Sequence, residues 1–243
     1  MIKRYSVCKL LYLIIKYIMD KSHIINYLGI IPARSGSVGI KNKNIYKIKD
    51  KELFRYTLEP AVQSKIDKIF FSTDSELYLS LYKKYFDKNK DVTDNYIRPS
   101  NISGSGSLFE EYIKDCLAYL NTKNYTVLNI VILQPTSLFR TPIQINDIID
   151  LHQQCNNNIK SVSTTLQDPY NMMYENKDMV IEHSYRNRQE YKPTYILNGA
   201  YFIFSVENFN NNNIKKYDIY KMSTLEGFDL DNEADLYIIK KIL

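Results

Sequence analysis

The residues best suited to chemistry lie in a glycine-containing loop near the start of the chain. A short apolar run leads into this loop, whose glycines and cations are Arg34, Gly36, Gly39, Lys41 and Lys43. Glycines let backbone N–H groups approach an anion closely, and the cations neutralise charge that the backbone cannot. A strand followed by a glycine loop and cations therefore indicates a polyphosphate site.

The glycine spacing excludes two common phosphate loops. A Walker loop requires Gly, four residues and then Gly-Lys-Ser/Thr, and the dinucleotide fingerprint requires G-x-G-x-x-G. In this chain the glycines stand at 36 and 39, and no Ser or Thr follows Lys43. For the loop taken alone, the alternative interpretation is an ordinary glycine turn with solvated lysines.

Two carboxylates near residue 230 form a second candidate site. In the run Phe228-Asp229-Leu230-Asp231 the aspartates stand two residues apart, and in an extended segment such residues share a face. Like charges held close together are unfavourable unless a cation lies between them, and Mg²⁺ prefers one or two carboxylates with phosphate oxygens and waters. Asp229 and Asp231 therefore predict a divalent-metal clamp. Asp231 can also be interpreted as the cap of the final helix, and the two interpretations are compatible.

Polar residues also follow a central apolar run, residues 128–133. Gln134 offers an amide that both donates and accepts, which suits a sugar or the edge of a base. Arg140 suits two-point contact with a carboxylate or phosphate. The alternative is a turn between a strand and a helix, capped by Thr141.

A third polar cluster comprises residues 186–190, which include Arg186 and Arg188, and the run that begins at Asn198. Two arginines near a cleft suit an acidic sugar. A solvated basic loop is the alternative interpretation.

The composition is typical of a soluble globular protein with a small anionic substrate. The chain of 243 residues is 44% apolar and 24% charged, and its net charge of +5 is spread along the sequence, so nucleic acid is not expected as a partner. Three cysteines, Cys8, Cys116 and Cys155, include no C-x-x-C pair. Neither a zinc site nor a redox pair is indicated, and the odd count fits a reducing cytoplasm. Cys116 is predicted to pack in the core.

The histidines carry no predicted chemistry. Residues 23, 152 and 183 have no partner at metal-ligand spacing, and His152 is assigned to a helix surface.

The first 26 residues are interpreted as an appendage to one domain over 27–243. Residues 7–19 are apolar but carry Lys9 and Lys16, so this stretch is too short and too charged for a membrane span of ~20 apolar residues. Lys16 also interrupts the apolar region that a signal peptide needs. We interpret Met19 as the natural start, and the alternative is a peripheral amphipathic anchor.

The remaining chain alternates apolar runs with helical patterns. Strands are predicted over 28–33, 68–72, 128–133, 161–165 and 201–204, and helices over 53–61, 77–85, 108–120, 142–151 and 232–243. This alternation predicts a three-layer α/β domain with a mostly parallel sheet and a ligand beyond the carboxyl ends of its strands. The irregular segment at about 167–197 is interpreted as a lid or dimerisation excursion.

In combination and in this order, the motifs resemble the cytidylyltransferases that activate acidic sugars, the CMP-N-acetylneuraminate (acylneuraminate) synthetases above all. The resemblance runs from about residue 28 to the C-terminus. It rests on residues 31–44, 72–76, 98–99, 133–137, 188–189, 198–200 and 229–231.

The resemblance implies a Rossmann-like nucleotidyltransferase fold, usually a homodimer, and transfer of CMP from CTP to the anomeric hydroxyl of an acidic sugar with Mg²⁺ and release of pyrophosphate. Such an enzyme serves surface polysaccharide or lipopolysaccharide biosynthesis in the cytoplasm. The implied nucleotide-binding residues are Arg34, Ser37, Gly39, Lys41, Lys43, Asn44, Arg98 and Ser107. The implied sugar-binding residues are Gln134, Arg188 and Asn198. Catalysis would fall to Arg34, Lys43, Asp229 and Asp231, and the two aspartates would bind the metal.

One departure from the family pattern affects the expected activity. Val38 stands where the family normally has lysine, and loss of such a charge-assisted contact costs ~1.5–3 kcal/mol. Lys41 is the candidate to reach inward and replace it. Two alternatives stay open: a synthetase for legionaminic, pseudaminic or 3-deoxy-octulosonic acid, and a degenerate nucleotide-binding protein with little or no turnover.

Overall fold

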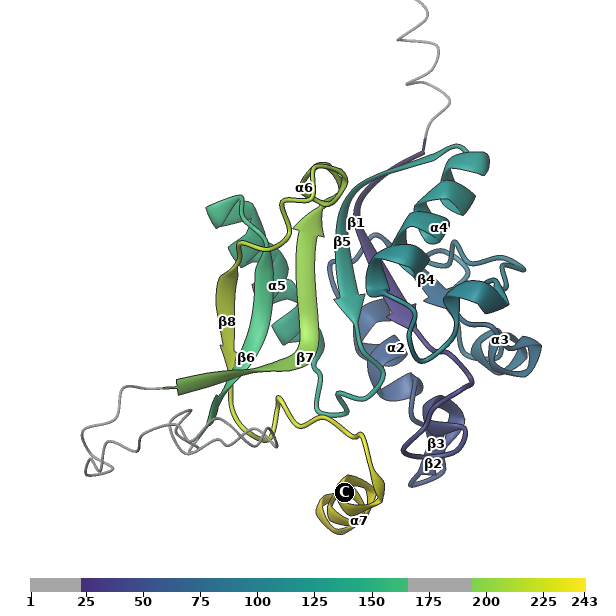
Figure 1. The fold of residues 1–243 in the computed structure, drawn as a ribbon, viewed down its shortest axis with the longest axis vertical. Helices are drawn as coiled ribbons and strands as arrows, with labels where there is room; N and C mark the ends of the chain where they lie inside the picture. Colours follow the sequence, from purple (N-terminus) through teal and green to yellow (C-terminus); the bar gives the residue numbers. More distant parts are fainter. Residues whose placement is uncertain (1–22, 166–193) are drawn as a thin grey trace, which may run out of the picture.

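The apolar runs form a six-stranded sheet in the order β4-β1-β5-β7-β6-β8 (Figure 1). The structure is a computed structural model that describes residues 23–165 and 194–243. The strands of this sheet are β1 His23–Pro32, β4 Lys68–Ser72, β5 Tyr125–Leu133, β6 Ile159–Thr165, β7 Thr194–Ser205 and β8 Asp218–Met222. Strand β7 runs antiparallel to both of its neighbours, and the other pairs are parallel. The prediction of a mostly parallel sheet is confirmed.

Helices cover both faces of the sheet, as the three-layer prediction requires. Helices α2 (Arg55–Val62), α3 (Glu76–Tyr82) and α5 (Pro142–Cys155) contribute to one buried cluster, and α4 (Phe109–Thr122) and α6 (Val206–Asn210) to the other. Strand β4 shows the alternation that creates two faces, because Ile69 and Phe71 pack in the first cluster and Phe70 in the second.

A third cluster brings the end of the described chain against the glycine loop. Leu230, together with Leu236 and Ile239 of α7 (Glu233–Ile242), packs against apolar side chains from three other segments. These are Ile40, Ile48, Leu53 and Leu138. Two of them lie in or next to the small hairpin of β2 (Lys47–Ile48) and β3 (Lys51–Glu52). Burial of Leu230 therefore fixes the aspartates on either side of it beside the loop that follows β1.

Several predicted elements and caps are confirmed. Strand β4 has the predicted bounds. The structure adds a cap for α3, because the Ser75 side chain accepts from the Tyr78 N–H. Thr141 caps α5 in a reciprocal arrangement with Gln144, as the alternative interpretation of that segment proposed. Cys116 is fully buried in the core, and burial raises the pKa of its thiol.

Other predictions need correction. Strand β1 begins at His23, so residues 23–26 belong to the sheet and not to an appendage. Asn232, not Asp231, caps α7, because its side chain accepts from the N–H groups of Ala234 and Asp235. His152 is buried on α5, and its Nδ1 lies 3.0 Å from the Tyr27 hydroxyl. Strand β8 and helix α6 were not predicted, because each has only five residues and shows little apolar periodicity.

Some predictions fall on parts of the chain that the structure does not describe. Residues 1–22, with the proposed start at Met19, lie outside the described residues, as does most of the 167–197 excursion. Its last four residues, 194–197, are part of β7. None of the described helices has the length and apolar character needed to cross a membrane.

Candidate nucleotide site

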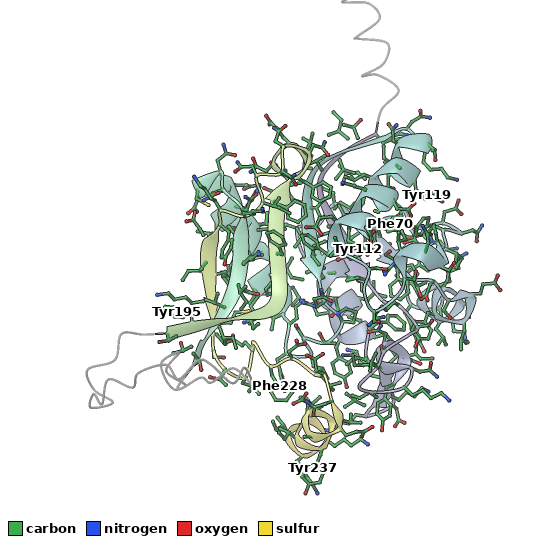
Figure 2. The ribbon with its side chains drawn as sticks, in the orientation of Figure 1. Phe70, Tyr112, Tyr119, Tyr195, Phe228 and Tyr237 are labelled. Atoms are coloured by element: carbon green, nitrogen blue, oxygen red, sulfur yellow. The ribbon has the colours of Figure 1, made fainter. Side chains whose placement is uncertain are left out.

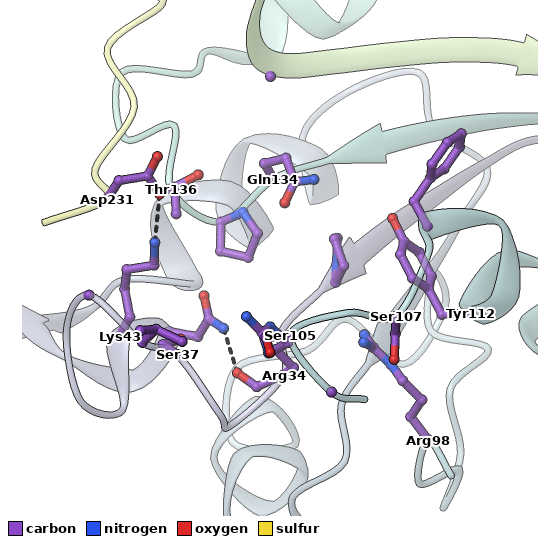
Figure 3. A pocket seen from close by; sticks show the side chains of 18 of the residues that line it. Arg34, Ser37, Lys43, Arg98, Ser105, Ser107, Tyr112, Gln134, Thr136 and Asp231 are labelled. Carbon is purple, nitrogen blue, oxygen red and sulfur yellow. Dashed lines mark hydrogen bonds and ion pairs between the residues drawn. The ribbon is translucent and has the colours of Figure 1, made fainter. Parts of the chain in front are cut away.

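A pocket of about 600 Å³ opens beyond the carboxyl ends of β1 and β5. Its volume lies in the range of ~300–1,000 Å³ that small-molecule sites occupy. The walls come from the loop after β1, from segment 98–112, from the loop after β5, and from Gly199, Asp229 and Asp231. Figure 3 shows Lys43 and Asp231 on one side of this pocket and Arg98, Ser107 and Tyr112 on the other.

The loop after β1 is held from two sides so that it faces the pocket. The Asp74 carboxylate, just after β4, accepts from the Ser35 N–H at 2.7 Å and from the Ser35 hydroxyl at 3.0 Å. The buried Asn44 side chain donates to the Arg34 carbonyl at 2.9 Å. The Arg34 guanidinium lines the pocket, and no hydrogen bond or ion pair to it is found within the described residues. Its positive charge is therefore available to an anionic ligand.

The glycine loop and the late aspartates are in direct contact. Lys43 Nζ lies 2.9 Å from Asp231 Oδ1 and donates to the Leu230 carbonyl at 3.1 Å. Gly39 lies so close to this segment that an added Cβ would be 2.2 Å from the Asp231 carbonyl oxygen. Real Cβ atoms do not approach that closely, so this packing requires glycine.

Asp229 presents a carboxylate that the protein leaves incompletely bonded. Its Oδ1 is buried and has no hydrogen-bond partner among the described residues. Burial raises the pKa of Asp229, the Thr136 side chain opposes that increase, and the charge of Asp231 adds to it. The Leu230 N–H donates to the Thr136 carbonyl at 3.1 Å, which ties the aspartate segment to the loop after β5.

The donor set of the two aspartates fits Mg²⁺. An orphaned carboxylate oxygen on Asp229 and a largely exposed Asp231, 66% accessible, give the hard oxygen ligands that Mg²⁺ prefers. No group of three or more His, Cys, Asp or Glu suited to a metal occurs within residues 23–165 and 194–243. A pair of carboxylates is nevertheless sufficient where phosphate oxygens and waters complete the octahedron.

Arg98 adds a second guanidinium to the pocket. It is 4% exposed and lies over the Tyr112 ring at 4.9 Å. Its Nε and Nη2 donate to the hydroxyl and carbonyl of Ser72 at 2.9 and 2.6 Å. Burial lowers the pKa of Arg98, and the nearby Arg34 charge lowers it further. Two guanidiniums that repel one another across a pocket are stabilised when an anion binds between them.

Most residues that the resemblance assigned to a substrate are brought together here. The pocket is lined by Arg34, Ser37, Gly39, Lys43, Asn44, Arg98, Ser107, Gln134, Asp229 and Asp231. Val38 also lines it and is 85% exposed, at the mouth. The structure therefore unites the two strongest motifs in the sequence, although they lie almost 190 residues apart.

Three other candidates are not placed in the pocket. Lys41 is exposed and does not line the pocket. Asn198 is buried, and its amide is bonded to the hydroxyls of Ser161 and Ser163. Arg188 lies outside the described residues.

The prediction that Arg140 binds an anion needs correction, because Arg140 is a buried structural residue. It donates to the Gln134 carbonyl at 3.0 Å, to the Ala200 carbonyl and to the Thr57 hydroxyl, and it lies over the Tyr201 ring at 4.9 Å. Arg140 thus ties the residue that follows β5 to the middle of β7.

The residues that sequence reasoning missed are hidden in segments with other evident roles. Tyr112 belongs to the apolar stripe of α4 and Thr136 to a turn, and both line the pocket. Gly199 has a φ of +70°, and a Cβ added to it would lie 4.0 Å from Asp229 Oδ2. Asp74 acts by accepting hydrogen bonds from Ser35. The only sign of this contact in the sequence is the polar run after β4.

The pocket thus combines cations, a glycine loop and two carboxylates around a space large enough for a nucleotide. Arg34 and Lys43 can neutralise phosphates, and the aspartates can hold a divalent cation near them. This arrangement suits transfer of a phosphoryl-type group, because that chemistry depends mainly on positioning and charge neutralisation.

Comparisons with known proteins agree with this interpretation of the pocket. A family model described as Cytidylyltransferase matches residues 28–242. An N-acylneuraminate cytidylyltransferase of Escherichia coli O18:K1:H7 is 30% identical over 86% of this chain, which spans about half the length of that relative. A CMP-N,N'-diacetyllegionaminic acid synthase of Legionella pneumophila is 24% identical over 89% of this chain and 95% of its own length.

Two solved structures share the fold. A CMP:2-keto-3-deoxy-manno-octonic acid synthetase solved with CTP superposes with a TM-score of 0.65 at 11% identity, over 89% of this chain and 98% of that one. A 4-diphosphocytidyl-2C-methyl-D-erythritol synthase from Anaerococcus prevotii gives 0.62 at 13% identity, over 90% and 98%. The Rossmann-like nucleotidyltransferase architecture predicted from the sequence is confirmed.

Proposed function

The chain belongs to the cytidylyltransferase family, and from this premise we propose that it transfers CMP from CTP to the anomeric hydroxyl of an acidic sugar and releases pyrophosphate. The observation that carries the proposal is the direct contact between the glycine loop and the aspartate segment: Lys43 Nζ lies 2.9 Å from Asp231 Oδ1, at one side of a pocket that Arg34 also lines. Phosphate-binding and cation-binding groups therefore face one space.

The chain's own residues would act mainly by positioning and charge. Arg34, Lys43 and the backbone of the glycine loop would hold the triphosphate, and Arg98 and Ser107 would lie beside the nucleoside. Gln134, whose side chain faces the pocket in Figure 3, would contact the sugar. The attacking anomeric oxygen would reach the α-phosphorus in line, while the cations stabilise the charge that develops on the phosphate oxygens.

Asp229 and Asp231 would hold Mg²⁺. When bound, the ion would neutralise phosphate charge and orient the nucleotide. The orphaned Oδ1 of Asp229 supports this role, because a buried carboxylate oxygen without a donor is costly unless a ligand completes it. No residue of the pocket is assigned as a general base.

The acceptor we favour is sialic acid, and the E. coli relative supports it. The Legionella relative, which matches this chain over nearly its full length, favours a second candidate, a legionaminic-type acid. We further propose a cytoplasmic homodimer that serves surface-glycan synthesis. The cytoplasmic location follows from the substrates, because CTP and sugar acids are cytoplasmic metabolites in such a scheme. The homodimer is supported by Ile196 and Leu197 of β7, two apolar side chains that are about half exposed.

The test is pyrophosphate release from CTP and Mg²⁺ with a panel of sialic, legionaminic, pseudaminic and 3-deoxy-octulosonic acids. Turnover with one acid identifies the acceptor. CTP binding without turnover on any acid would favour the degenerate nucleotide-binding protein.

Variants locate the chemistry within that assay. Asp229→Asn and Asp231→Asn are expected to reduce the rate ~100-fold or more, the scale seen when a preorganised charge is removed from a site. Asp94→Asn is the matched control, because Asp94 is exposed and pairs with Lys123 outside the pocket. Full activity in both pocket variants would remove the metal assignment.

A further inference from the structure

One polar group in the pocket has no assigned role and no partner. The hydroxyl of Tyr112 is buried and makes no hydrogen bond within the described part of the chain, and the residue as a whole is 7% exposed. Tyr112 lies in the first turn and a half of α4 and lines the pocket. Figure 3 shows its oxygen turned toward the pocket interior. Leaving a buried hydroxyl unpaired is costly, so native proteins rarely do so without a reason.

The position of Tyr112 identifies which part of a ligand it would meet. Lys43 and the aspartates lie on the opposite side of the pocket (Figure 3), where a triphosphate and its cation would bind. Apart from Arg98, which lies over the Tyr112 ring, segment 98–112 contributes apolar or neutral side chains to the pocket wall, among them Ile102, Ser107 and Phe109. Such a lining suits a planar base rather than phosphate.

The Arg98 guanidinium completes this end of the pocket. It lies over the Tyr112 ring, 4.9 Å from the ring centre, within the range of a cation–π contact. A guanidinium can only donate hydrogen bonds, whereas a pyrimidine edge presents both donors and acceptors. The tyrosine hydroxyl, which both donates and accepts, is the complementary group.

We propose that the Tyr112 hydroxyl is a specificity-determining contact that hydrogen-bonds the edge of the nucleotide base. This inference rests on the proposed function, since it assumes that a nucleoside triphosphate occupies the pocket. It adds a recognition residue that the sequence motifs did not contain.

The experiment compares Tyr112→Phe with the wild type by calorimetry with CTP and Mg²⁺. The variant is expected to bind CTP about 3- to 10-fold more weakly, the fold-change that one neutral hydrogen bond supplies. Without ligand, its melting temperature should be unchanged or higher, because the substitution removes an unpaired buried hydroxyl and little else. A structural hydroxyl would give the opposite result, with a lower melting temperature and unchanged affinity.

Tyr119→Phe is the matched control. Tyr119 lies on the same helix (Figure 2), outside the pocket, and its ring packs against Tyr96 in a tilted arrangement and against Phe70 edge-on, at ring-centre distances of 4.9 and 5.9 Å. Its variant should bind CTP like the wild type.

A third arm uses 2'-deoxy-CTP to separate base from ribose. An equal loss of affinity for both nucleotides supports the base contact. A loss confined to CTP would assign the hydroxyl to the ribose 2'-OH and overturn the proposal, as would unchanged CTP binding in Tyr112→Phe. If the wild type binds no nucleotide at all, the proposed function itself fails, an outcome that differs from each of these.

Discussion

The ion pair between Lys43 and Asp231 leads to a prediction about metal affinity. One carboxylate oxygen of Asp231 accepts a hydrogen bond from the Lys43 ammonium at 2.9 Å. A divalent cation that binds Asp231 must therefore compete with this ammonium. Replacing the lysine by a neutral side chain of similar length, Lys43→Met, should make the cation site stronger in the absence of nucleotide.

The magnitude follows from the exposure of the pair. Lys43 is 14% exposed and Asp231 is 66% exposed, so the pair is partly solvated and worth ~0.2–1 kcal/mol. Removing a +1 charge about 5 Å from a divalent ion adds roughly 1.7 kcal/mol in a water-like dielectric. After allowance for screening and overlap between the two effects, we expect a net gain of ~1–2 kcal/mol, or about 5- to 30-fold in Kd.

The assay is Mn²⁺ binding followed by electron paramagnetic resonance, without nucleotide. Lys43→Met should bind Mn²⁺ more tightly than the wild type and CTP more weakly, because the lysine would otherwise neutralise a phosphate. Lys41→Met is the control, since Lys41 is exposed and outside the pocket. An unchanged or weaker Mn²⁺ affinity in Lys43→Met would refute the competition argument.

Three further predictions concern the loop and the core. Gly39→Ala should lower the free energy of unfolding, measured in urea, by ~1–3 kcal/mol, because its Cβ would lie 2.2 Å from the Asp231 carbonyl oxygen. Gly36→Ala is the control: its Cβ would have its nearest neighbour at 3.9 Å, so the free energy of unfolding should change by less than ~0.5 kcal/mol. Equal effects of the two substitutions would contradict the packing argument. Val38→Lys, at an 85% exposed position, should tighten CTP binding by at most ~1 kcal/mol, and a larger gain measured by calorimetry would mean that the mouth closes over the ligand. Burial lowers the pKa of His152 below its ordinary value near 6.5; the unfolded chain therefore binds the proton first as pH falls, and stability should decrease from pH 6.5 toward the lowered value. Melting curves of His152→Gln between pH 7.5 and 5 should lack that component, and an identical slope in the variant would count against it.

The fold was predictable where a local pattern and the tertiary environment agree. Residues 68–72 are a buried run between polar segments, and they form β4 with the predicted bounds. Strand β1 begins five residues before the predicted start at 28, because His23 pairs with Tyr125 of β5. This pairing between distant segments could not be predicted from residues 23–27 alone. Strand β8 lies at the edge of the sheet and pairs only with β6. Most of its residues are exposed, so its sequence carries little apolar signal.

The candidate site was predictable where a motif carries its own chemistry. The glycine loop and the paired aspartates each indicated a charged ligand, and the structure places them in contact. Arg140 shows the limit of such reasoning, since a guanidinium can bond backbone carbonyls in the interior as well as it binds an anion. Tyr112 shows the converse, because an aromatic residue in the stripe of a helix is expected in the core, and only the three-dimensional structure reveals its unpaired hydroxyl.

The contact between Gly39 and the Asp231 carbonyl has a consequence for biosynthesis. The two halves of the site are joined by residues 188 positions apart in the chain, so translation makes the cationic half long before the carboxylate half. The order of synthesis therefore completes the carboxylate side of the site, which would hold the metal ion, only after its cationic side.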